Sequence, residues 1–185
     1  MYGLVNRAIE EMAIQQGGQE IWEAIKLKAG VDESTFLSMQ AYPDEITYSL
    51  VSSASEILST PADELLRAFG RHWVLFTANE GYGDLLKTTG KNLSEFIENL
   101  DIMHSRVAST MSDLKPPSFE CIHHSADKIE VRYFSEREGL APMVVGLLEG
   151  LAEMFETPVK VSHRQSANND DFETFDVEYL SSSTI

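Results

Sequence analysis

Cysteine, basic residues and long apolar runs are scarce in this chain of 185 residues. Its one cysteine, Cys121, can form neither an internal disulfide nor a cysteine-based metal site. Lysine and arginine total 14 against 30 acidic residues, a net charge of −16, which argues against nucleic acid or an anionic membrane surface as a partner. The longest uncharged runs, such as 139–148, have ten residues, whereas a membrane helix needs about 20.

The composition is otherwise that of a folded, acidic protein. Nine Phe, six Tyr and two Trp are too many for a disordered chain. The length favours one domain, 1–185, with a helical part over about 1–60 and an α+β part over about 61–185. Arg7, Glu10 and Glu11 interrupt the apolar pattern at the start, which argues against a signal peptide, so we expect a cytoplasmic protein.

Helical spacing of apolar residues dominates the first two thirds of the sequence. Thr60, followed by Pro61 and two acids, is predicted to cap a helix. Helices are predicted over 3–15, 19–29 and 44–58, from 61 through the apolar residues up to Phe76, and from about 93 to 112, with Pro116-Pro117 ending the last.

The last third changes to the strand period. Strands are predicted over 118–124, 128–136, 159–162 and 172–180, with a helix over 142–155 between the second and third. Helices followed by this β-β-α-β-β order favour an α+β fold with an antiparallel sheet.

The strand over 128–136 carries the first candidate site. Successive side chains alternate between faces, so Tyr133, Ser135 and Arg137 share the core face, while Glu130 lies on the face expected to be solvated. The three provide hydrogen-bond donors along roughly 13 Å, which suits a ligand with separated carboxylates. The structural alternative is that Arg137 pairs with one of the chain's own acids.

His104 is the second candidate, because it lies on the apolar face of its predicted helix, four residues after Leu100 and three before Val107. Such a histidine is commonly a core residue bonded to a carbonyl. The functional alternative is a single imidazole ligand for a haem iron.

Both candidates fall within stretches that resemble the H-NOX family, the haem–nitric oxide/oxygen binding domains. The resemblance covers nearly the whole chain and is strongest towards stand-alone cyanobacterial members and the haem domain of soluble guanylate cyclase. It is carried by Met1-Tyr2-Gly3-Leu4-Val5-Asn6, Trp22-Glu23-Ala24-Ile25-Lys26, Glu80-Gly81-Tyr82-Gly83, Asn99-Leu100-Asp101-Ile102-Met103-His104, Pro117-Ser118-Phe119-Glu120-Cys121 and, most specifically, Tyr133-Phe134-Ser135-Glu136-Arg137-Glu138-Gly139-Leu140.

The resemblance implies a non-covalently held haem b. His104 would be the proximal iron ligand, and Tyr133, Ser135 and Arg137 would bind the propionates, with Arg137 able to form a bidentate pair. Pro117 resembles the family proline that bends the macrocycle. Family placement makes Val5, Trp73, Met143 and Leu147 the distal wall.

The distal wall predicts which gas binds. Oxygen-binding members of the family place a tyrosine hydroxyl over the iron, but the matching stretch 141–148 here has no tyrosine. We therefore expect NO and CO to bind and O₂ to bind weakly, unless the indole N–H of Trp73 replaces that hydroxyl.

The resulting hypothesis is a sensor that is not itself an enzyme. NO would weaken the bond between iron and His104, and the released helix would signal to a histidine kinase, a cyclic-di-nucleotide enzyme or a cyclase. The alternatives are an oxygen sensor, a gas carrier without a signalling partner, or a module in which Arg137 holds a different carboxylate ligand.

Overall fold

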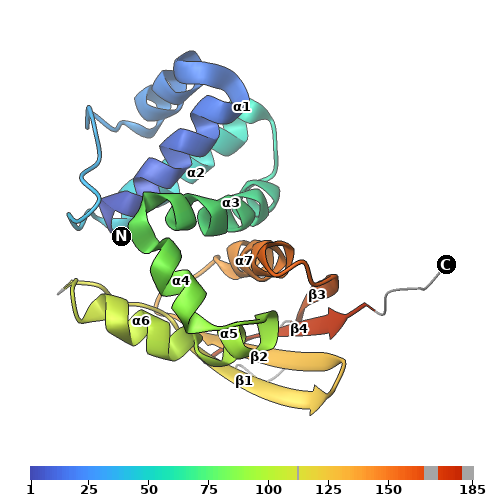
Figure 1. Ribbon diagram of the computed structural model, residues 1–185. Helices are drawn as coiled ribbons and strands as arrows, with labels where there is room; N and C mark the ends of the chain where they lie inside the picture. Colours follow the sequence, from blue (N-terminus) through green and yellow to red (C-terminus); the bar gives the residue numbers. More distant parts are fainter. Residues whose placement is uncertain (112, 165–170, 181–185) are drawn as a thin grey trace.

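The computed structural model describes residues 1–111, 113–164 and 171–180. Three N-terminal helices form one part of the molecule and a four-stranded sheet lies in the other (Figure 1). Helix α7, Ala141–Met154, lies between α3 and the sheet. This α+β architecture is the predicted one.

The helices of the N-terminal part begin and end close to where they were predicted. α1 runs over Gly3–Ala29 and breaks at Gly18, whose φ of 78° is readily accessible to glycine. α2 spans Asp44–Leu58 and α3 spans Ala62–Thr77. The predicted cap was wrong: Pro61 takes the N-cap position, and the Thr60 hydroxyl instead donates to the carbonyl of Leu58.

The single helix predicted over 93–112 is two helices. After the irregular turn η1, Ala78–Tyr82, the chain forms α4, Gly83–Thr89, then α5, Leu93–Glu98, and α6, Leu100–Ala108. Asn99 separates α5 from α6, with ψ near 4° and a side-chain amide that donates to the carbonyl of Thr89 at 2.8 Å. α6 ends well before Pro116, so the proline pair does not end it; residue 112 lies outside the described residues.

The sheet is antiparallel throughout, with strand order β1-β2-β4-β3. Its strands are β1 over Ser118–Ser125, β2 over Lys128–Phe134, β3 over Val159–Arg164 and β4 over Glu173–Tyr179. β2 ends at Phe134, so Ser135 and Arg137 follow the strand instead of extending its face as predicted. Glu130, expected to be solvated, is buried beneath Arg132 and Arg164, which both bind its carboxylate.

Two hydrophobic clusters form the core. One lies among α1, α2 and α3 around Trp22, Ile25 and Leu50, and the other packs α5, α6 and α7 on the sheet around Val131 and Phe175. In the part of the chain that the structure describes, no helix combines the length and apolarity needed to cross a bilayer.

Candidate functional site

A cavity of about 720 Å³ is lined by all the residues that the sequence analysis predicted for the site. Its volume lies within the range typical of small-molecule and cofactor sites. The predicted residues reach it from five helices or strands and the loops beside them: Val5, Trp73, His104, Pro117, Tyr133, Ser135, Arg137, Met143 and Leu147. Residues far apart in sequence therefore converge on one site.

His104 belongs to α6 and lines the cavity. Its Nδ1 atom is buried and has no hydrogen-bond partner among the described residues. The ring stacks on Phe119 of β1, with centroids 5.5 Å apart and planes at 25°. Burial lowers the pKa of His104 and outweighs the opposing charge of Asp101, so the ring is neutral near pH 7. A neutral imidazole is the form that binds metals.

Tyr133 and Ser135 lie at the end of β2, beside the cavity. Tyr133 is buried, opposite Phe119 in the sheet, and its ring lies 5.3 Å from that of Phe119. Burial raises the pKa of Tyr133, so its hydroxyl stays protonated and can donate. The Ser135 hydroxyl accepts a hydrogen bond from the backbone N–H of Arg137 at 3.0 Å, which tightens the turn that leaves the strand.

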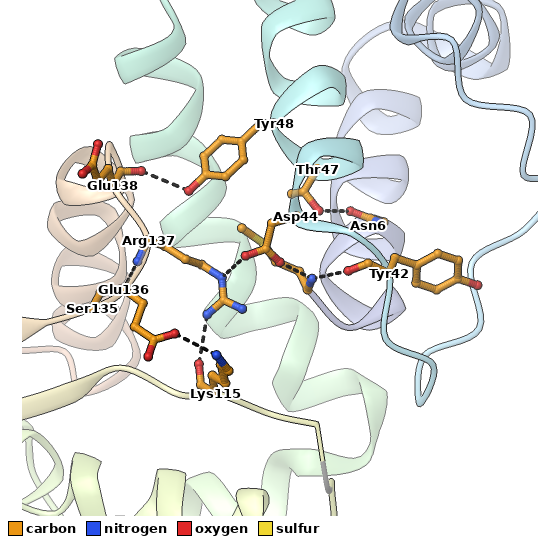
Figure 2. Close-up of polar contacts among 11 residues, drawn as sticks. Asn6, Tyr42, Asp44, Thr47, Tyr48, Lys115, Ser135, Glu136, Arg137 and Glu138 are labelled. Atoms are coloured by element: carbon orange, nitrogen blue, oxygen red, sulfur yellow. Dashed lines mark hydrogen bonds and ion pairs between the residues drawn. The ribbon is translucent and has the colours of Figure 1, made fainter.

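Arg137 is paired with one of the chain's own acids, which is the structural alternative left open by the sequence. Figure 2 shows its Nε donating to Asp44 at 2.8 Å and its Nη1 donating to the carbonyl of Lys115 at 2.9 Å. Asp44 also binds the amino group of Met1. Burial raises the pKa of Asp44, but these cationic donors outweigh burial, so the pKa of the carboxyl lies below its ordinary value and the group is charged.

The pairing leaves part of Arg137 available. Its Nη2 has no hydrogen-bond partner among the described residues, and the side chain lines the cavity. A guanidinium has five N–H donors in a planar fork, so it can bind Asp44 and a ligand carboxylate together.

The opposite wall is mainly apolar. Val5 comes from α1, Trp73 from α3, and Met143 and Leu147 from α7. Only Trp73 among these four has a donor group, its indole N–H, and its ring also packs against Phe69 and Phe76. Thr77 lines the same cavity, but its hydroxyl donates to the carbonyl of Trp73 at 2.8 Å.

The sequence analysis did not identify several residues of the site. Asp44 was seen only as the start of a helix, because nothing local shows which of thirty acids meets Arg137. Met103, Val107 and Met111 also line the cavity from the His104 side. Val107 and Met111 follow His104 by three and seven residues, and this helical spacing was the signal that could have found them, whereas the adjacent Met103 gave no such signal.

These features fit a haem. The cavity supplies an apolar slot, one neutral imidazole with an unpartnered buried nitrogen, and donors at the rim suited to two propionates. No cluster of three or more histidine, cysteine or acidic side chains placed for a metal occurs among the described residues.

Curated relatives with similar sequences are guanylate cyclases. The chain is 28% identical over 162 residues to soluble guanylate cyclase gcy-31 of Caenorhabditis elegans, covering 87% of this chain and 23% of that protein. It is 30% identical over 155 residues to gcy-33 of the same organism, covering 84% and 16%. The chain thus spans less than a quarter of these relatives.

Solved structures share the fold over nearly the whole chain. An H-NOX protein from S. oneidensis in the Fe(II)NO ligation state superimposes with a TM-score of 0.87 at 21% identity, covering 97% of this chain and 99% of that one. An oxygen-binding H-NOX domain related to soluble guanylate cyclases gives 0.80 at 18% identity, covering 97% and 95%. The family model described as haem-NO-binding matches residues 2–163, and the chain belongs to this family, the H-NOX domains.

Proposed function

We propose that this chain is a haem-based sensor of nitric oxide, with CO as a second ligand and O₂ bound weakly or not at all. One observation carries the proposal: the imidazole of His104, whose Nδ1 has no hydrogen-bond partner among the described residues, lines the same apolar cavity as the guanidinium of Arg137. That pairing suits a flat apolar cofactor with carboxylates at its edge and an iron at its centre.

Five of the predicted residues would hold the haem b. His104 would be the iron ligand, Tyr133, Ser135 and the Nη2 of Arg137 would bind the propionates, and Pro117 would press on the ring. The haem supplies the iron at which a diatomic gas binds. The apolar lining keeps water away from that position, because the side chains there offer few hydrogen bonds.

The distal wall supports the preference for NO and CO. Bound O₂ draws electron density from iron and is stabilised by a nearby donor, whereas ferrous NO and CO need no strong donor. Met143 and Leu147 of α7 have no N–H or O–H in their side chains. Trp73 alone among the four predicted distal residues has a side-chain donor that could favour O₂, and oxygen sensing is therefore the alternative function.

Signalling to a partner is part of the proposal. The chain matches only a fraction of guanylate cyclases, and the family model that matches it describes the haem-NO-binding domain. We propose that NO weakens the bond between iron and His104, that α6 then moves, and that a histidine kinase, a cyclic-di-nucleotide enzyme or a cyclase reads the change. By linkage, such a partner must also change the affinity for NO.

Absorption spectra of the ferrous protein test the gas preference. The protein is reduced without oxygen and then given NO, CO or air. We expect complexes with NO and CO and no stable oxygen complex. A stable oxygen complex that is lost in Trp73→Phe would contradict the proposed selectivity and favour oxygen sensing.

Matched histidine variants test the ligand. His104→Ala should abolish the His-ligated ferrous spectrum, whereas His123→Ala, at a surface histidine bonded to Glu98, should leave it unchanged. Absence of a haem spectrum in the unmodified protein after incubation with haem would overturn the proposal. Partner activity measured with and without NO separates a sensor from a gas carrier.

A further inference from the structure

The first residues of β1 are bonded to the helix that carries His104. β1 is an edge strand, so some of its N–H groups have no neighbouring strand to bind. The N–H of Phe119 donates to Oδ1 of Asp101 at 2.6 Å, and the Ser118 hydroxyl donates to Oδ2 at 3.0 Å. Both carboxylate oxygens of Asp101 are therefore committed to β1.

Asp101 and His104 lie one turn apart on α6. Phe119, whose backbone Asp101 binds, stacks its ring on the imidazole of His104. α6 and β1 are thus joined at two points, once by a charge-assisted hydrogen bond and once by the ring contact.

The same attachment lies beside a proline pair. Pro116 and Pro117 have no N–H, so Ser118 and Phe119 are the first residues after them that can donate a backbone hydrogen bond. Both prolines line the cavity. Fixing Phe119 therefore also restricts where Pro117 can lie.

We propose that Asp101 is a positioning residue, which holds Phe119 and Pro117 against His104 and so sets how the imidazole is presented to the cavity. This inference rests on the proposed function, because it concerns the residue that would bind iron. Asp101 does not itself line the cavity. It acts through the backbone of β1, and movement of α6 would be transmitted to Pro117 through this contact.

Three variants separate the parts of the contact. Asp101→Ala removes both acceptors, Asp101→Asn keeps one carbonyl oxygen for the N–H of Phe119, and Ser118→Ala removes only the weaker contact. Each is studied as the ferrous haem-loaded protein. The iron–histidine vibration is recorded by Raman scattering, and backbone amide exchange is followed for Phe119 and, as a control, Val131 in the centre of the sheet.

We expect Asp101→Ala to shift or broaden the iron–histidine vibration and to speed exchange at Phe119 by about tenfold or more, with Val131 unchanged. Asp101→Asn should recover part of both signals, and Ser118→Ala should lie near the unmodified protein. A merely structural contact would alter exchange without changing the vibration.

The failures of the two proposals are distinguishable. An unmodified protein with no iron–histidine vibration overturns the proposed function, and this inference with it. An unmodified protein with that vibration, together with an Asp101→Ala variant that shows the same vibration, overturns the positioning role of Asp101 alone.

Discussion

Replacement of Gly146 by alanine is expected to destabilise the contact between α3 and α7. A Cβ atom at Gly146 would lie 1.9 Å from the carbonyl oxygen of Arg67 and 2.8 Å from its carbon. Those are backbone atoms in the middle of α3, so relief requires the two helices to separate by about 1 Å. Overpacking of this kind costs about 1–3 kcal/mol or more.

Alanine also favours the helical conformation, and this gain in stability must be subtracted from the steric cost. Gly146 lies within α7, where alanine favours the helix by about 1 kcal/mol over glycine. A net loss of about 2 kcal/mol follows when the steric cost is near the upper end of its range. For a domain of this size that lowers Tm by roughly 4–8 °C.

Gly150→Ala is the matched control one turn along the same helix. Its nearest neighbours would be Arg71 Cα at 3.1 Å and the Arg71 carbonyl oxygen at 3.2 Å, contacts that a few tenths of an ångström relieve. We expect it to stay within about 1 kcal/mol of the unmodified protein. Urea and thermal unfolding measure the stability of both variants. A Gly146→Ala protein as stable as Gly150→Ala would refute the argument from close backbone packing.

Three other side chains give further predictions. Glu149 is paired with Arg67 and Arg71; burial raises its pKa, but the two arginines outweigh burial, so the folded-state pKa lies below its ordinary value. The pairing therefore stabilises the fold at pH values above the ordinary pKa of a glutamate, and this stabilisation is lost as pH falls through the folded-state pKa. Glu149→Gln should lower the free energy of unfolding at pH 7 by about 1–2 kcal/mol and flatten the acid limb of a plot of urea midpoint against pH. An unchanged plot would contradict this. Burial raises the pKa of Cys121 to about 11, so alkylation at pH 7 should be at least about a hundredfold slower in the folded protein than in urea, and equal rates would show an exposed thiol. Arg137→Lys loses the planar fork, so haem transfer to apomyoglobin should be about 10–100-fold faster, and an unchanged rate would exclude Arg137 as a propionate ligand.

Much of the candidate site could be predicted from the sequence. The pattern of Tyr133, Ser135 and Arg137 with His104 upstream indicated that these four residues serve one site, and the cavity contains them all. The partner of Arg137 could not be predicted. Asp44 lies 93 residues away, and only the packing of α2 near the end of β2 brings the two together.

The ends of the helices and strands likewise divide into those that the sequence predicted and those that it did not. The helix over Asp44–Leu58 was predicted to the residue, because the apolar period and the acids of its first turn are local signals. The break at Asn99 and the end of β2 at Phe134 were missed. At Asn99 a hydrogen bond to the distant carbonyl of Thr89 accompanies the break, and no periodicity records such a contact.

Local sequence patterns were therefore enough to predict the fold class and the antiparallel strands, and the family resemblance added nine residues that line the cavity. Hydrophobic spacing and motif residues act over a few positions, and the sequence displays them directly. Tertiary structure alone decided how Arg137 is shared between Asp44 and the cavity, how α3 and α7 meet through glycine, and how Asp101 joins the His104 helix to β1. These features depend on which distant atoms share a space, and that is known only once the chain has packed.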